Sequence, residues 1–157
     1  MVTNIEKIWE DKSSKAVYLL DLMDNDGFTA YDFNVTLMIV RLAIEQVCIG
    51  MAQVFWEYTP KRSSLPYLLH LCSHFSKTPT AIFHKTTYEN QRMYHLICNA
   101  SRILRNNKTY QVNSNDSETA ISIAEEFVRL AREEVSEHIK HLRTLAEEYK
   151  KRYNLAD

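Results

Sequence analysis

The chain has 157 residues, 45% hydrophobic and 25% charged, which fits one globular domain over residues 1–157 and excludes a disordered chain. Its formal net charge of −1 excludes a nucleic-acid binder that relies on bulk positive charge, although a local basic patch is allowed. Three cysteines without a C-x-x-C pair predict neither a disulfide framework nor a structural zinc site.

The first predicted helix covers residues 4–23, where apolar side chains recur at steps of three and four. It should end at the turn formers of residues 24–27, where Gly27 can take the left-handed cap. A second helix is predicted for residues 29–58. Apolar side chains cover most of its circumference, so we expect it to be the central helix.

The few polar residues of the second helix allow two interpretations. Arg41 and Glu45 are four residues apart and can form an ion pair, or they can face a partner surface. Because charged and amide residues interrupt the apolar stretch 36–51, it falls short of a membrane span. Residues 1–10 are amphipathic and resemble no secretory signal, so we expect a cytoplasmic protein without a membrane contact.

The remaining elements are also predicted to be helical. Ser63 or Ser64 can cap a third helix, and a loop over residues 76–87 should hold one short turn at 81–84. A fourth helix is predicted for residues 88–105. After a polar loop at 111–115, Asn115 or Asp116 can begin a long last helix that reaches residue 153. Four or five helices with mostly short connections predict an all-α, antiparallel up-and-down bundle.

Two histidine pairs are candidate metal ligands. His70 and His74 can share a helix face, but two ligands are too few for a site. His138 and His141 lie near glutamates, but the pattern matches only loosely the Glu-x-x-His pairs of di-iron bundles. We therefore predict no metal and no cofactor, and no serine or cysteine nucleophile motif is found.

Cations, amides and a phenol gather where the fourth helix ends. Arg102 and Arg105 lie one turn apart, and Asn106, Lys108 and Tyr110 follow. Guanidinium groups that reach one surface suit a phosphate ligand. The same cations can instead offset the helix dipole, with Asn106 simply ending the helix.

Three segments together resemble the HEPN family of small helical bundles. They are LAIEQVCIGM (42–51), YTPKRSSLPYLL (58–69) and NASRILRNNKTYQV (99–112), and a long terminal helix follows the third. HEPN domains are often encoded beside, or fused to, minimal nucleotidyltransferases in prokaryotes. The resemblance thus implies a nucleotidyltransferase as one candidate partner.

HEPN ribonucleases carry an arginine, a polar residue and, four to six residues after the arginine, a histidine, in a metal-independent cleft built by two protomers. Here Arg105 and Asn106 match the first two positions, and Tyr110 stands where the histidine would be. The resemblance implies a homodimer that binds RNA or nucleotide phosphate, with Arg102 and Lys108 adding positive charge. It also implies a weak ribonuclease of the toxin or phage-defence type.

The substitution of Tyr110 for histidine bears on catalysis. A histidine exchanges protons near neutral pH, whereas an ordinary tyrosine is a poor base there and serves better as a hydrogen-bond donor or general acid. The alternative function is a non-catalytic interaction module. It would bind a protein partner through the mixed surface of the second helix and through Trp56 and Tyr58.

Overall fold

The computed structural model describes residues 2–24, 33–61, 64–106 and 115–154. All regular structure in these ranges is helical, which confirms the all-α class. The helices are α1 (Val2–Asp24), α2 (Phe33–Trp56), α3 (Leu65–Cys72), α4 (Thr78–Ile82), α5 (Tyr88–Cys98), α6 (Ala100–Asn106) and α7 (Asp116–Tyr153). The described ranges thus hold seven helices, where four or five were predicted.

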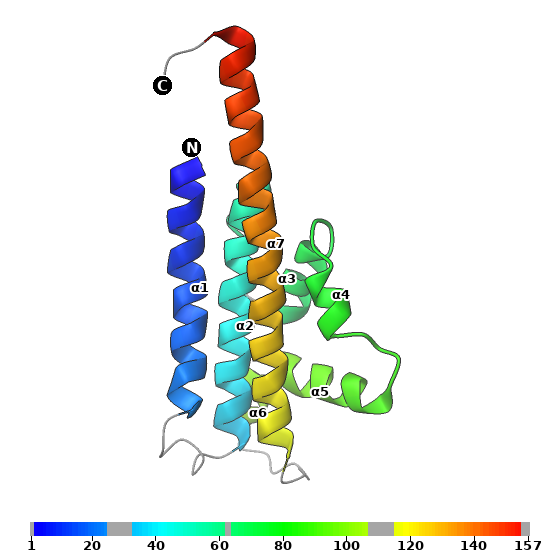
Figure 1. Ribbon diagram of the computed structural model, residues 1–157. Coiled ribbons are helices and arrows are strands. Elements are labelled where there is room, and N and C mark those ends of the chain that lie inside the picture. Colours follow the sequence, from blue (N-terminus) through cyan, green and yellow to red (C-terminus); the bar gives the residue numbers. More distant parts are fainter. Residues whose placement is uncertain (1, 25–32, 62–63, 107–114, 155–157) are drawn as a thin grey trace.

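The three long helices α1, α2 and α7 lie side by side and form the body of the molecule (Figure 1). α1 runs down the view of Figure 1, α2 runs up, and α7 runs up again. Between them, α3 to α6 bring the chain back down beside α2. The order is therefore up-and-down, but the third leg is divided into four short helices.

The predicted fourth helix, residues 88–105, is wrong as a single element because it breaks at Asn99. The side-chain amide of Asn99 donates to the carbonyl oxygen of His95 at 2.8 Å, and its backbone N–H donates to the same oxygen at 3.0 Å. Asparagine side chains compete with the backbone for such hydrogen bonds and so favour helix ends. The carbonyl of Asn99 then accepts from the N–H of Ile103 at 2.9 Å, which begins α6.

The other short elements differ only at their ends from the prediction. The turn expected at 81–84 is α4, which begins earlier, at Thr78. Ser64 and Asn115 occupy the positions before α3 and α7 as predicted, but neither side chain makes a capping hydrogen bond. The predicted cap at Gly27 lies outside the described residues.

Helix α2 is the centre of the core, as its apolar pattern predicted. Leu37, Val40, Ile44 and Met51 are fully buried and pack with side chains from the other helices. Gly50 marks a close approach of α1 to α2, since a Cβ atom there would lie 2.8 Å from Cβ of Lys12. A larger residue would push the two helices apart.

Arg41 and Glu45 form an ion pair within the chain, as the first of the two interpretations of these residues predicts. Nε of Arg41 lies 2.8 Å from Oε1 of Glu45, and both side chains are largely buried. Burial raises the pKa of the Glu45 carboxyl, while the charge of Arg41 opposes that rise. The Glu45 carboxylate therefore has a charged partner inside the chain.

By length and composition alone, α2 could cross a membrane, contrary to the expectation from residues 36–51. Most of its apolar stretch is buried inside the bundle, however. The central helix of a helical bundle meets the same criteria of length and composition.

The last part of α7 projects beyond the ends of α1 and α2 (Figure 1). Every residue from Arg143 to Asn154 is exposed, including Leu145, Tyr149 and Tyr153. Arg143 still reaches back to form an ion pair with Glu6 of α1. Beyond that pair, packing within the chain contributes little to the stability of this segment.

Candidate functional site

The short helix α6 directs the predicted basic residues toward solvent. Ala100 and Ile103 are buried and fix α6 against α2. Arg102, Arg105 and Asn106 are exposed. Because residues three and four apart share a helix face, the two guanidinium groups can reach one surface.

Four of the eight arginines in the described ranges form ion pairs, and Arg102 and Arg105 are not among them. Arg41, Arg92, Arg129 and Arg143 each form an ion pair with a carboxylate. No such pair or hydrogen bond joins Arg102 or Arg105 to any residue within the described ranges. Their charges are thus available to an anionic ligand.

The position of Arg105 also fits a purely electrostatic role, because it lies in the last turn of α6. A cation there offsets the negative end of the helix dipole and stabilises the helix by about 0.3–1 kcal/mol. That role needs no ligand, so a binding measurement separates it from a phosphate site.

Two of the predicted site residues, Lys108 and Tyr110, lie outside the described residues. The described chain resumes at Asn115, and α7 begins at the same end of the bundle as α6 ends (Figure 1). Arg102, Arg105 and Asn106 are therefore the part of the predicted site that the structure places.

A salt bridge that the sequence did not reveal fixes the beginning of α7. Arg92 of α5 donates to both carboxylate oxygens of Asp116, at 3.2 and 2.5 Å, and also pairs with Glu89. The Asp116 side chain is only 2% exposed. Arg92 and Asp116 are 24 residues apart in the chain, a separation that carries no periodic signal.

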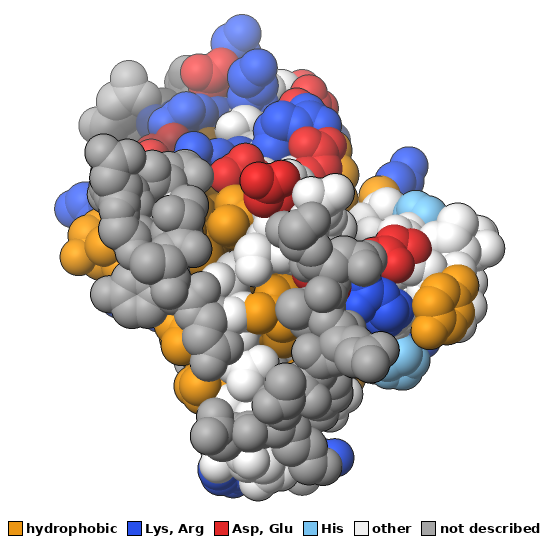
Figure 2. Space-filling model, turned by 90° about the horizontal axis from the view of Figure 1, so that it is seen from below, with side chains coloured by type: hydrophobic (Ala, Val, Ile, Leu, Met, Phe, Trp, Pro, Cys, Tyr) orange, Lys and Arg blue, Asp and Glu red, His pale blue; other side chains and the backbone are white. Residues whose placement is uncertain are grey.

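The end of the bundle that carries α6 has a mixed surface (Figure 2). In this view, Lys and Arg side chains stand next to Asp and Glu side chains, with hydrophobic patches nearby. The described side chains in this view form no broad basic face. The described side chains therefore present both signs of charge to a ligand at this end.

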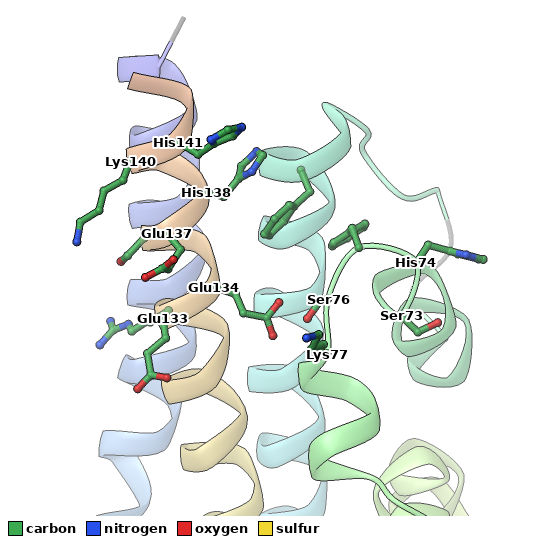
Figure 3. Close-up of a pocket in the computed structure, with 14 residues that line it drawn as sticks. Ser73, His74, Ser76, Lys77, Glu133, Glu134, Glu137, His138, Lys140 and His141 are labelled. Carbon is green, nitrogen blue, oxygen red and sulfur yellow. The ribbon is translucent and has the colours of Figure 1, made fainter. Parts of the chain in front are cut away.

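A second candidate site is a groove of about 1170 Å³ between α7 and the turn from α3 to α4 (Figure 3). Glu134 of α7 lies in it and accepts a hydrogen bond from Oγ1 of Thr78 at 2.6 Å. His138 packs against the ring of Phe55, with centroids 4.4 Å apart. Burial and the neighbouring charge of His141 lower the pKa of His138, which favours its neutral form.

The two histidine pairs do not converge on a metal site. The rings of His70 and His74 are 5.1 Å apart, and His74 also stacks on Trp56. In Figure 3, His74 points away from α7 and from His138. Within the described ranges, no three His, Cys, Asp or Glu residues are arranged to hold a metal ion.

His138 cannot replace the histidine missing beside Arg105. It lies about 22 residues into α7, roughly 33 Å along the helix from Asp116. α6 ends near the start of α7 (Figure 1), so this length of helix separates it from His138. The groove and the α6 end are thus separate places.

Aromatic side chains gather where α2 ends. Trp56 and Tyr58 are 49% and 36% exposed. The ring of Trp56 lies 5.8 Å from that of His74, and the hydroxyl oxygens of Tyr58 and Tyr67 are 3.5 Å apart. This exposed group contains Trp56 and Tyr58, the two aromatic residues that the alternative function would use to bind a protein partner.

Comparison with known proteins assigns no family. No protein-family model matches the chain, and no curated protein is similar to it at a significant level.

Proposed function

We propose that this chain is a HEPN-type helical domain that binds the phosphates of RNA or of a nucleotide at the end of α6. Arg105 holds a phosphate oxygen, Arg102 and Lys108 add positive charge, and Asn106 and Tyr110 supply hydrogen bonds. The observation that carries the proposal is the pair of exposed arginines, one turn apart, that no carboxylate of the described chain neutralises.

The HEPN resemblance of residues 42–51, 58–69 and 99–112 supports the same function. In that family two protomers form the cleft, so the proposal includes a homodimer. Cleavage of RNA is the enzymatic version. It would be weak, because Tyr110 stands in place of the histidine that exchanges protons.

Binding of labelled single-stranded RNA at low salt tests the proposal. Arg105→Ala should weaken binding about tenfold or more, and Arg102→Ala by a smaller factor, since each removes a charge-assisted contact. The matched control is Arg152→Ala. Arg152 is also an exposed arginine in the last turn of a helix, but it lies at the far end of α7.

The outcome separates the two roles of Arg105. If Arg105 only offsets the helix dipole, Arg105→Ala and Arg152→Ala should lower the free energy of unfolding to a similar small extent. The two variants should then bind RNA equally well. That result, or a wild-type chain that binds neither RNA nor nucleotide at low salt, would overturn the proposal.

A protein-interaction module is the second candidate, favoured by the exposed rings of Trp56 and Tyr58. A nucleotidyltransferase is the partner class that the resemblance offers. Trp9 is buried and Trp56 is half-exposed, so Trp9→Phe isolates the fluorescence of Trp56. Partner binding at this surface should shift that emission to shorter wavelength, and Trp56→Ala should weaken binding.

A further inference from the structure

A groove of about 580 Å³ lies between α1 and α7, and no residue of α6 lines it. Trp9 and Ile139 are buried and form the apolar part of its wall. The rest of its lining comes from both helices and consists of cations, carboxylates and serine hydroxyls. A groove of this volume can hold a ligand of the size of a sugar phosphate.

The way α1 lies against α7 brings two serines to the same level of the groove. The two helices run in opposite directions (Figure 1), and Glu6 of α1 pairs with Arg143 of α7. Ser13 lies seven residues after Glu6, and Ser136 lies seven residues before Arg143. Because both helices rise by about 1.5 Å per residue, Ser13 and Ser136 lie at about the same height along the groove.

Ser13 has an unusual environment for a serine. Its side chain is buried, with the residue only 2% exposed, and it lines the groove. The Ser13 hydroxyl makes no hydrogen bond within the described part of the chain. Most buried polar groups have a hydrogen-bond partner, so this hydroxyl is available to a molecule in the groove.

Two cations of α7 lie one turn to either side of Ser136. Arg132 and Lys140 are each four residues from it, so the three side chains share one face of the helix. In Figure 3, Lys140 points away from Ser76 and Lys77, which line the other groove. No carboxylate of the described chain forms an ion pair with Arg132 or Lys140. An anion near Ser136 can therefore receive charge-assisted hydrogen bonds from both.

The carboxylates of the groove limit which anion it suits. Arg143 neutralises Glu6, but Glu10 forms no ion pair within the described ranges. Glu10 lies about one turn from Ser13, toward Glu6. A carboxylate accepts hydrogen bonds from hydroxyl groups and repels a second negative charge. The groove therefore favours a ligand with one anionic end and one hydroxylated end over a polyanion such as RNA.

We propose that the α1–α7 groove binds a small phosphate monoester of the sugar phosphate class. Arg132 and Lys140 hold the phosphate oxygens, and the hydroxyls of Ser13 and Ser136 donate to the same group. Glu10 accepts hydrogen bonds from the hydroxyls of the sugar. This site is separate from the one proposed at the end of α6 and does not depend on it.

A fluorescence titration of the full chain with ribose 5-phosphate at low salt tests the site. The chain has two tryptophans, so Trp56→Phe leaves Trp9, which lines the groove, as the single reporter. Ribose 5-phosphate should change the Trp9 emission in a saturable way. Inorganic phosphate should bind more weakly, because it lacks the hydroxyls that reach Glu10, and ribose alone should cause no change.

Substitutions in the groove should weaken this binding. Arg132→Gln and Lys140→Gln should each raise the dissociation constant about tenfold, and Ser13→Ala about fivefold. The matched control is Lys151→Gln, since Lys151 is an exposed lysine of α7 outside the groove. It should leave the dissociation constant unchanged. Circular dichroism melts should show that all four variants remain folded.

Glu10→Ala tests whether the ligand is a sugar phosphate and not phosphate alone. The variant loses the acceptor for the sugar hydroxyls and also the charge that repels phosphate. The preference for ribose 5-phosphate over inorganic phosphate should therefore narrow. A preference that stays the same in Glu10→Ala would contradict the assignment of Glu10 and of the sugar phosphate class.

Arg105→Ala separates this inference from the proposed function. It should weaken RNA binding at α6 and leave the Trp9 response to ribose 5-phosphate intact. Calorimetry on the same samples measures binding without relying on Trp9. The inference is overturned if neither method detects saturable binding of ribose 5-phosphate, if Lys151→Gln weakens it as much as Lys140→Gln, or if Arg105→Ala abolishes it.

Discussion

In the proposed function, catalysis would depend on Tyr110, which stands where the HEPN ribonucleases that the sequence resembles carry a histidine. Tyr110→His restores a group that can exchange protons with the attacking hydroxyl or the leaving oxygen near neutral pH. We expect this variant to cleave RNA faster than wild type by about 10²-fold or more, the usual contribution of a positioned acid or base.

Cleavage should be followed in the presence of a metal chelator, because the proposed reaction needs no metal. The double variant Tyr110→His, Arg105→Ala is the control and should lose the gain. An equal rate for Tyr110→His and wild type would show that residues 105–110 do not form a HEPN-type site.

Asp116 is a single residue that should contribute strongly to the stability of the fold. Its buried carboxylate receives two hydrogen bonds from Arg92, whose side chain is 21% exposed. Asp116→Ala removes the charge-assisted bonds at the beginning of α7, so the free energy of unfolding should fall by about 2 kcal/mol. Urea denaturation measures this change.

Glu89→Ala is the matched control for Asp116→Ala, because Glu89 pairs with the same arginine. Its side chain is 52% exposed, so its removal should cost about 1 kcal/mol or less. Equal effects of the two variants would contradict a special role for the buried pair.

At the scale of elements, α7 combines two segments that contribute differently to the stability of the fold. Residues up to Ile139 carry its buried positions, whereas residues from Arg143 onward are exposed. Ending the chain after Thr144 removes no buried side chain and keeps the Arg143 pair with Glu6. The free energy of unfolding should change by about 0.5 kcal/mol or less, as for other surface changes.

Urea denaturation of the shortened chain tests this expectation, with Ile139→Ala as the contrasting variant. Ile139 is 8% exposed, so its truncation should cost about 2 kcal/mol or more. A large loss on shortening would mean that the projecting segment is buried in an assembly.

Long periodic elements were predictable from the sequence, and their interruptions were not. The predicted last helix, from Asn115 or Asp116 to residue 153, agrees with α7, because one apolar stripe and a charged outer face extend through it. The break at Asn99 was missed since Leu96, Ala100 and Ile103 keep helical spacing across it. Only the hydrogen bonds of Asn99 reveal the end of α5.

The candidate site was only partly predictable, for a related reason. The spacing of Arg102 and Arg105, three residues apart, was enough to predict that they share one face of a helix. Local spacing gave no signal for the Arg92–Asp116 pair or for the groove between α7 and the turn from α3 to α4, because those depend on contacts between distant segments. Periodicity shows which face of a helix is apolar, but it does not show which other helix packs against that face.

At the scale of the whole molecule, a net charge of −1 limits how RNA can be held. Three cations, Arg102, Arg105 and Lys108, are proposed to contact phosphates. Each phosphate neutralised on a single strand contributes about −0.7 to the slope of log K against log salt, so a protomer should give a slope of about −2.

Fluorescence anisotropy of labelled RNA over a salt series measures this slope. A cleft shared by two protomers should double it to about −4, whereas two independent sites on a dimer should each keep about −2. Arg105→Ala should make the slope shallower by about 0.7 per site, and Arg152→Ala should leave it unchanged. A slope near zero would exclude phosphate contacts, and one far steeper than −4 would require a broad basic surface that the mixed charges of Figure 2 do not provide.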